Sequence, residues 1–478
     1  MIRSEILELV NLIQKTKCES NTIEIKSAKV DCPKLFDTLS SFSNQSGGGT
    51  IIFGIDERED YSVCGVYDAA DLQKKIIEQS IQMEPELRPL CTVVDIDGKT
   101  VVCAEIQEID NFQKPCFYRG AGRLKGSYIR VGDGDRRMTE YEVYSYEAFK
   151  KKIHDELRTN DRADINEIRT DYLKKYLIEL PLKKSNLAAL PEDKLCAIQG
   201  FTADEKPTLT GIMLFSLYPQ AFYPQLCVTA VSVAGTEIGN SSDVGERFID
   251  NVKIDGTITQ MLDSALQFVK RNMKVKTIID PDTGKRADKA DYPIIAVREL
   301  IINALVHRDY SIHTDTTPIT IRMFSDRLEI ENPGGLYGRM TLDQLGKVSA
   351  DTRNPFLAGA LEIMEITENR YSGIPTVLAA MKEAGLPAPK FESERGVFRV
   401  TLYNSGYVNT PADNSEEAKL LNFCKTPRSR AELSDFYEGQ LSINYVMTKL
   451  VHPLIADGRL KMTLPDKPKS KKQRYYSV

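Results

Sequence analysis

Apolar and polar positions follow two different periods over the first 149 residues. Residues 71–82 repeat apolar side chains at helical spacing, whereas residues 101–106 are a short apolar run bounded by turns. We therefore expect an α/β domain over residues 1–149. Its expected helices are 6–16, 32–43 and 71–82, and its expected strands are 22–26, 50–55, 91–96 and 101–106.

The rest of the chain divides where this pattern changes. A charged, helix-favouring stretch at 150–193 is interpreted as a connector, and a second α/β pattern follows over 194–404. Residues 405–415 combine serine, asparagine and proline, which is typical of a linker. Over 416–478, three short helical patterns precede two strand-like pieces, the order of a winged helix. The sequence thus predicts an α/β multidomain protein.

Composition narrows the class of protein. The formal net charge is -5, so nucleic acid would have to bind at a local basic patch. Nine cysteines without a Cys-x-x-Cys pair, and only four histidines, argue against structural zinc and for reduced thiols. The N-terminal segment carries charges within its apolar pattern, unlike a signal peptide, and no apolar run approaches the roughly 18 residues of a membrane span. We expect a soluble, cytoplasmic protein with no membrane partner.

Carboxylates gather at the ends of the first two expected strands. Glu19 and Glu24 flank the start of the first strand, and Lys26 shares a face with Glu24. The second strand ends in an acidic run that begins at Asp56. Carboxylates that converge at strand ends can hold a divalent metal, which can activate water against a phosphodiester. Acidic residues at strand ends are also commonly solvated surface, and spacing alone leaves both interpretations open.

A basic segment lies between residues 114 and 137. Its cations are interleaved with Phe117, Tyr118 and Tyr128, a composition suited to phosphate contacts and base stacking. An ordinary charged pair of hairpins would have the same composition. The candidate nucleic-acid-binding residues of the first domain are Lys26, Arg119, Arg130, Arg136 and Arg137.

The first 140 residues resemble the Schlafen-type AlbA-like domain. The resemblance rests on ESNTIEIK, SFSNQSGGGTIIFGIDE and KPCFYRGAGRLKGSYIRVGDGDRRMT, in that order. In eukaryotic Schlafen ribonucleases the glutamates of this motif and a downstream aspartate carry nuclease activity, so the resemblance implies catalytic roles for Glu19, Glu24 and Asp56, with Mn²⁺ as a candidate metal. Many bacterial relatives are described only as regulators, which implies nucleic-acid contact more firmly than cleavage.

A second set of polar residues lies on a helix that Pro293 opens. Glu299 and Asn303 are four residues apart and share one face, which His307 continues. Asn303 can ligate a Mg²⁺ that bridges phosphates, and Glu299 can orient a water toward the terminal phosphate. A solvated helix would often show the same Glu-x-x-x-Asn spacing. The residues downstream are therefore needed to distinguish a phosphate-binding site from a solvated helix face.

Glycines and one arginine follow this helix. Gly334 and Gly335 come after an expected strand and allow the backbone to approach a ligand closely. Ser372 and Gly373 stand at the entrance of a helix, whose first amides and dipole can bind phosphate. Between these motifs, Arg353 lies where a lid residue could meet phosphate charge, with an ordinary surface loop residue as the alternative.

This order resembles the Bergerat ATP-binding fold, an α/β sandwich. More specifically, RELIINALVHRDYS, DRLEIENPGGL, RNP and ENRYSGIP resemble bacterial proteins described as RecG-like helicases or transcriptional regulators. The resemblance implies ATP and Mg²⁺ as cofactors, with Asn303 as metal ligand. Where the wider fold has an aspartate that recognises adenine, this chain has Glu331 or Asn332, and Tyr371 replaces a phosphate-binding glycine. Slow hydrolysis and binding without hydrolysis therefore both stay open. No Walker A sequence occurs, so we do not expect a helicase.

The C-terminal segment offers another basic surface. Residues 442–457 form the candidate recognition helix, which carries Lys449. Lys471, Lys472 and Arg474 lie in the expected wing. A helix in the major groove with a basic wing on the backbone fits duplex DNA, and protein docking is the alternative.

Three functions follow from these observations. The first is an ATP-binding, DNA-binding regulator whose nucleotide state modulates nucleic-acid binding. The second is a metal-dependent nuclease for RNA or DNA, in antiviral defence, with the nucleotide domain as sensor. The third is a scaffold. We expect ATP and nucleic acid as partners, DNA rather than RNA, and a homo-oligomer, because Bergerat domains often work as dimers.

Overall fold

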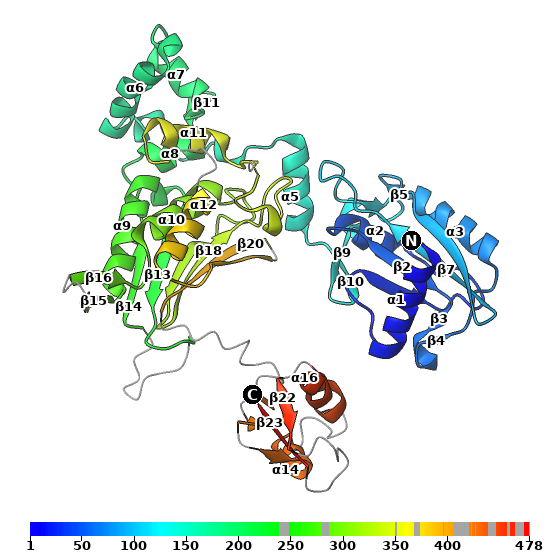
Figure 1. Ribbon diagram of the computed structural model, residues 1–478. Coiled ribbons are helices and arrows are strands. Elements are labelled where there is room, and N and C mark those ends of the chain that lie inside the picture. The colour runs from blue at the N-terminus through cyan, green and yellow to red at the C-terminus, as the bar shows by residue number, and fades with distance from the viewer. Residues whose placement is uncertain are drawn as a thin grey trace. The chain divides into compact units, whose positions relative to one another are not determined.

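The computed structural model describes most of the chain. The described residues are 1–238, 248–279, 286–348, 351–367, 373–394, 396–405, 420–421, 423–425, 427–437, 446–456, 459–463 and 473–477. They fall into two compact units, Met1–Ser405 and Gly406–Val478, and each is described by itself (Figure 1). Within these described ranges, no helix is long and apolar enough to cross a membrane.

The first domain of the larger unit is built on a four-stranded sheet with the order β1-β2-β7-β6. β1 pairs parallel with β2, and β7 is antiparallel to both β2 and β6. The strands are β1 (Ile23–Lys26), β2 (Gly49–Phe53), β6 (Leu90–Ile96) and β7 (Lys99–Ile106), and the main helices are α1 (Arg3–Thr16), α2 (Phe36–Asn44) and α3 (Ala69–Ile81). Each of these elements overlaps a predicted segment, so the mixed α/β prediction for this region is confirmed.

Apolar residues on both faces of this sheet are covered by helices. On β2, Ile51 and Phe53 join a hydrophobic cluster with α2 and α3, whereas Ile52 joins a second cluster with α1. Successive strand residues point to opposite faces, so the consecutive apolar residues 51–53 must be covered on both sides of the sheet. Ile6 and Val10 of α1 provide the cover on the second face.

The basic segment lies on short elements after this sheet. The hairpin of β9 (Tyr128–Val131) and β10 (Gly134–Arg137) packs against α2. Helix α5 (Glu140–Lys151) follows, and Thr139 and Glu142 form a reciprocal cap at its N-terminus. The remaining elements are β3 (Ile55–Asp56), η1 (Glu57–Glu59), β4 (Ser62–Val63), β5 (Met83–Glu84), β8 (Phe117–Tyr118) and α4 (Arg123–Gly126).

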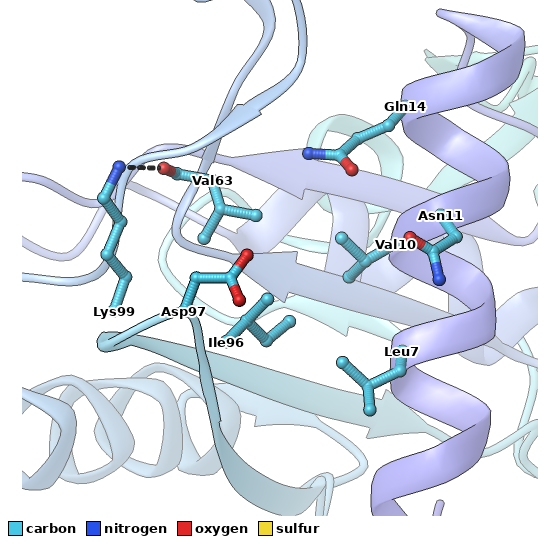
Figure 2. Close-up of a pocket in the computed structure, with 8 residues that line it drawn as sticks. All are labelled: Leu7, Val10, Asn11, Gln14, Val63, Ile96, Asp97 and Lys99. Carbon is cyan, nitrogen blue, oxygen red and sulfur yellow. Dashed lines mark hydrogen bonds between the residues drawn. The ribbon is translucent and has the colours of Figure 1, made fainter.

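A small pocket lies between α1 and the turn that joins β6 to β7 (Figure 2). It is lined by Leu7, Val10, Asn11, Gln14, Val63, Ile96, Asp97 and Lys99. None of the residues that the sequence proposes for a functional site is among them, and we assign the pocket no role.

Residues 150–193 form short helices, part of which pack with the second domain. Leu173, Tyr176 and Leu180 belong to the same hydrophobic cluster as Leu361, in the second domain. The charged residues that suggested a connector occupy the exposed face of an amphipathic helix, as on other surface helices. The elements here are η2 (Asp155–Leu157), η3 (Ile165–Glu167), α6 (Asp171–Lys183), η4 (Ser185–Leu187), α7 (Glu192–Ile198), β11 (Thr202–Ala203), β12 (Lys206–Pro207) and α8 (Leu209–Phe215).

The second domain has a six-stranded sheet with the order β14-β13-β17-β18-β20-β19. β13 and β17 are parallel, and all other neighbours are antiparallel. Helices α9, α10 and α12 lie over one face, where their apolar residues and those of the strands share one cluster (Figure 1). The strands are β13 (Val228–Ser232), β14 (Asp250–Ile254), β17 (Ile319–Met323), β18 (Arg327–Pro333), β19 (Lys390–Glu394) and β20 (Val397–Tyr403).

The helices of this domain frame the predicted constellation. They are α9 (Ile258–Asn272), α10 (Ile294–His307), α11 (Pro355–Ile363) and α12 (Gly373–Glu383). Helix α10 begins directly after Pro293, as predicted. Minor elements are η5 (Pro219–Ala221), the hairpin β15 (Val275–Ile279) and β16 (Arg286–Ala290), and η6 (Leu342–Gln344).

The smaller unit combines short helices with a three-stranded antiparallel sheet, β21-β23-β22. Helical structure covers 446–456 of the predicted recognition helix, and strands occur at both predicted positions. The linker at 406–415 and most of the predicted helix 416–424 lie outside the described residues. The elements are β21 (Arg428–Ser429), α14 (Arg430–Phe436), the π-helical η7 (Val446–Val451), α16 (His452–Ala456), β22 (Leu460–Met462) and β23 (Arg474–Ser477).

Candidate functional site

The start of α12 lies directly against the polar face of α10. A Cβ atom on Gly373 would be 2.5 Å from Oε1 of Glu299 and 3.0 Å from Nδ2 of Asn303. Both α10 side chains are half-buried, whereas Leu300 and Ala304 face the core. A Cβ at position 373 would displace the end of the Glu299 side chain, so glycine allows the first turn of α12 to lie close to the carboxylate and amide. The structure therefore joins two motifs that are 70 residues apart in the chain.

His307 extends the same face of α10 by one turn. The side chain of His307 is exposed, and the protein packed around it, together with the charge of Arg353, lowers its pKa from the usual value. The ring is therefore neutral at pH 7 and can donate or accept one hydrogen bond at each nitrogen. It is placed to be a polar neighbour of a ligand, not a cation.

The two candidates for base recognition lie on opposite faces of β18. Leu328, Ile330 and Asn332 alternate with Glu329 and Glu331, and the first three are buried. Asn332 therefore faces the helices, and its Oδ1 is buried without a hydrogen-bond partner in the described chain. Glu331 points to the other face of the sheet.

Glu331 is held there by two arginines. Its Oε2 accepts from Nη1 of Arg322 at 2.9 Å and from Nη2 of Arg399 at 2.8 Å. Burial acts to raise the pKa of Glu331, but these two hydrogen bonds outweigh it and hold the pKa below its usual value. The structure thus separates Glu331 from Asn332, which the sequence left as alternatives.

The turn after β18 packs against the end of α10. Gly334 has a φ of 110°, and a Cβ there would be 2.8 Å from Cβ of Asp309. Gly334 is thus required both by its backbone conformation and by the close approach of Asp309. Gly335 follows, with its carbonyl 3.4 Å from Nη2 of Arg353. The described part of the site therefore includes Asp309, which the sequence did not suggest.

Arg353 forms a buried ion pair with Asp309. The two side chains are 6% and 1% exposed, and the guanidinium also lies 4.8 Å from the ring of Tyr337. Burial acts to raise the pKa of Asp309, but the charge of Arg353 outweighs it and the pKa lies below its usual value. Arg353 was predicted in a lid over nucleotide phosphates. In this structure it is enclosed beside α10 and committed to a carboxylate.

The N-terminal carboxylates surround a different buried arginine. Arg130 Nη1 lies 2.8 Å from Glu24 Oε2 and 3.0 Å from Asp135 Oδ1, and its Nη2 lies 3.8 Å from Glu19 Oε2. Lys26 forms a second ion pair with Glu24. Burial raises the pKa of Glu19 to about 7. The structure therefore brings Glu19 and Glu24 together, with protein cations already between them.

Asp56 is held by other partners. Its Oδ2 lies 2.7 Å from Nζ of Lys29, and its Oδ1 accepts from the backbone N–H of Arg58. Among the described residues, no group of three or more His, Cys, Asp or Glu side chains could hold a metal ion. The third carboxylate that surrounds Arg130 with Glu19 and Glu24 is Asp135. The catalytic roles predicted for Glu19, Glu24 and Asp56 stay predictions.

The basic residues predicted to bind nucleic acid in the first domain differ in whether they already form ion pairs. Arg130 and Lys26 are engaged with the carboxylates, and Arg119 pairs with Glu84 and Glu86. Arg136 and Arg137 on β10 are exposed. Only these last two present charge outward from the hairpin without an ion pair in the described chain.

Several predicted residues in other segments have less structural detail. In the smaller unit, Arg474 lies 3.4 Å from Glu432 on α14. Lys449 lies in η7, but its side chain, like Lys471, Lys472 and the larger unit's Ser372, is outside the described residues. Their predicted roles stay predictions.

Two family matches cover parts of the larger unit. Residues 19–139 match the family described as Schlafen, AlbA_2, and residues 316–402 match HATPase_c_4, described as Putative ATP-dependent DNA helicase recG C-terminal. They confirm the predicted order, a Schlafen AlbA-like domain followed by a RecG-like ATPase domain. The second match includes Asn332 and Gly373, whereas Glu299 and Asn303 precede it.

Two solved structures are similar to parts or most of the chain. The DIP2311 protein from Corynebacterium diphtheriae is 18% identical, over 94% of this chain and 93% of that one, with a TM-score of 0.40. The N-terminal domain of Putative ATP-dependent DNA Helicase RecG-related Protein from Nitrosomonas europaea is 25% identical, over 28% of this chain and 92% of that one, with a TM-score of 0.23. No curated protein matches the chain.

Proposed function

We propose that this chain, with its Schlafen AlbA-like and RecG-like ATPase domains, binds ATP with Mg²⁺ between α10 and α12 and uses its nucleotide state to modulate nucleic-acid binding. The observation that carries the proposal is the contact of Gly373 with Glu299 and Asn303. It places the N-terminus of an eleven-residue helix, with its amide donors and positive dipole end, beside a carboxylate and an amide. That combination suits a phosphate with its metal ion.

The residues present fit a nucleotide with Mg²⁺. Asn303 offers an amide oxygen to the metal, and the bound metal would neutralise phosphate charge. Glu299 can orient a water toward the terminal phosphate. Asn332 supplies a buried Oδ1 without a partner in the described chain, which a base amino group would satisfy. The proposal requires that ATP binds, and it does not require that ATP is hydrolysed.

Nucleic acid is proposed to contact the β9–β10 hairpin. Arg136 and Arg137 are exposed there, and each cation that neutralises a phosphate releases a counterion. The smaller unit is proposed to add a winged-helix contact with duplex DNA through Arg474 and the basic residues near it. DNA is preferred over RNA because of this second contact. A homo-oligomer is part of the same proposal.

Binding of nucleotide is tested by calorimetry with ATP and Mg²⁺. The wild-type protein is expected to bind, and Asn303→Ala to lose at least about tenfold in affinity, because one metal ligand is removed. Asn251→Ala, an exposed strand residue in the same domain, is the matched control and should bind as wild type does. No magnesium-dependent binding, or equal affinity in Asn303→Ala, would overturn the proposal.

The first domain is proposed to bind nucleic acid without cleaving it. Arg130 and Lys26 already compensate Glu19 and Glu24, which leaves these carboxylates poorly suited to attract a cation. Incubation of the full chain with single-stranded RNA and duplex DNA in Mn²⁺ tests this. Cleavage that is lost in Glu24→Ala would replace the binding proposal with the nuclease.

A further inference from the structure

Helix α5 is anchored in the first domain at its C-terminal half. Glu147 forms an ion pair with Arg123 of α4, and the ring of Phe149 stacks on Phe112 with centroids 4.6 Å apart. Phe112 belongs to the loop between β7 and β8. Movement of α5 would therefore disturb α4 and this loop, which lead into the basic segment.

The same helix contacts the nucleotide domain. Tyr141 Oη donates a hydrogen bond to Asp309 Oδ2 at 2.7 Å. The rings of Tyr144 and His313 are 4.7 Å apart, and Phe149 meets the edge of Tyr337 at 5.4 Å. All three contacts reach the segments that flank the proposed nucleotide site, the end of α10 and the turn after β18.

A second link runs through the loop of Phe112. Asn111 Nδ2 donates to the carbonyl of Gly338 at 3.0 Å, and the guanidinium of Arg339 lies 4.7 Å from the ring of Phe112. Gly338 and Arg339 continue directly from the Gly334–Gly335 turn. The first domain thus touches both sides of the site by short-range contacts.

Asp309 contacts both α5 and the buried Arg353 of the site. Its carboxylate accepts from Tyr141 of α5 and from the backbone N–H of Ser311, and it pairs with Arg353. Arg353 has no second carboxylate partner in the described chain, and its Nε is buried without a hydrogen-bond partner. Arg353 is also near enough to His307 for its charge to lower the pKa of that imidazole. The buried Arg353 cation therefore lies beside His307, one helical turn beyond Asn303, and also contacts the turn after β18 through the carbonyl of Gly335 at 3.4 Å.

We infer that Asp309 and Tyr141 couple the nucleotide site to the first domain. Phosphate and the Asp309 carboxylate compete for the same guanidinium, so bound nucleotide draws Arg353 away from Asp309. Asp309 is then left with its hydrogen bonds from the Tyr141 hydroxyl and the Ser311 N–H, and these two bonds strengthen. The stronger bond to Tyr141 shifts α5. Tyr141 is a positioning residue that acts through Asp309. This inference rests on the proposed nucleotide binding, whose regulation it specifies.

Coupling of this kind is reciprocal. If nucleotide changes the affinity for nucleic acid by some factor, nucleic acid must change the affinity for nucleotide by the same factor. A purely structural role for Tyr141 would stabilise the fold without any such linkage. The two roles are therefore separated by measuring nucleotide binding and the response of α5 in the same variants.

The experiment uses the full chain with a nonhydrolysable ATP analogue and Mg²⁺. Hydrogen exchange of the α5 amides and of residues 107–115 is measured with and without the analogue. In the wild type, exchange in α5 is expected to change by about tenfold. In Tyr141→Phe, the analogue is expected to bind within about threefold of wild type, while the response of α5 is lost. Tyr172→Phe, the same deletion of a hydroxyl at an exposed position of α6, is the control and should keep the response.

Each outcome decides a different claim. Wild-type binding of the analogue without a response in α5, or an unchanged response in Tyr141→Phe, overturns the coupling and leaves the proposed nucleotide binding intact. No binding of the analogue by the wild type overturns both. If Tyr141→Phe is poorly folded, Asp309→Asn can be tested in its place. This substitution keeps the shape of the side chain and removes the negative charge that competes with phosphate for Arg353. It should likewise lose the response.

Discussion

The two domains of the larger unit each bury one arginine among acidic side chains, but the number of acids differs. Arg130 is surrounded by Glu19, Glu24 and Asp135, and it also donates to the carbonyls of Ser20 and Ile23 at 3.3 Å. Arg353 has the single carboxylate of Asp309. If Arg130 moved away, all of its carboxylate partners would lose their cation together. If Arg353 moved away, only Asp309 would lose a cation, and Asp309 would still accept its other hydrogen bonds.

This difference assigns different roles to similar chemistry. Glu24 and Asp135 would lose their shared buried cation without Arg130, so this arginine is required for the fold of the first domain. Asp309 keeps Tyr141 and Ser311 as donors if Arg353 departs. Arg353 is therefore suited to exchange its partner for a ligand, and Arg130 is not.

The largest expected effect is the loss of Arg130. Arg130→Met is expected to lower the free energy of unfolding by about 3–5 kcal/mol, because buried carboxylates lose their compensating charge. Urea unfolding measured against Arg136→Met, an exposed arginine on the same hairpin, checks this, and the control should change by less than about 0.5 kcal/mol. A loss below about 1 kcal/mol for Arg130→Met would show that the cluster is not held by its arginine.

Removal of Arg353 is expected to cost less. Arg353→Met should lower the free energy of unfolding by about 2 kcal/mol, because Asp309 keeps two hydrogen-bond donors and only the ion pair is lost. Arg271→Met, which removes an exposed arginine of α9 that pairs with Asp250, is the control for urea unfolding. If Arg353→Met destabilised as much as Arg130→Met, the two arginines would be equally structural and the comparison would fail.

Local periodicity was enough to predict the elements that carry the site. Pro293 marked the start of α10, and the spacing of Glu299 and Asn303 placed both on one face. The alternation along β18 also contains the information that separates Glu331 from Asn332, since buried Leu328 and Ile330 share the parity of Asn332. That signal was available in the sequence but was not decisive without knowledge of which face the helices cover.

The contacts that give the site its electrostatics could not be predicted in this way. Tyr141 and Asp309 are 168 residues apart, and no spacing rule links a tyrosine on one helix to an aspartate after another. Asp135 lies in a hairpin rich in basic residues, so the sequence pattern did not indicate that it pairs with Arg130. Such pairs depend on how separate domains and hairpins pack, which the pattern along the chain does not encode.

The smallest expected effect is a difference in pH dependence. Burial raises the pKa of Glu19 from 4.5 to about 7, so the folded state favours the protonated carboxyl. Stability from this group is fully present below its ordinary value and is lost as pH rises through about 7. The pKa of Asp309 is instead held below 3.8, so its stabilising contribution is lost only when the pH falls below that value. Between about pH 4.5 and 7, therefore, only Glu19 of these two should weaken the fold as pH rises.

Glu19→Gln isolates this term, because the amide cannot titrate. Between pH 4.5 and 7 the wild type should lose about 1 kcal/mol more of its free energy of unfolding than the variant does, after allowance for partial solvent exposure. Glu156, whose pKa burial also raises to about 7, contributes the same slope to both proteins and cancels in the difference. Parallel stability curves for the two proteins would mean that Glu19 is ionised in the fold at neutral pH. Glu19 would then add its negative charge to the cluster around Arg130, and that cluster would differ even more from the pair of Arg353 and Asp309.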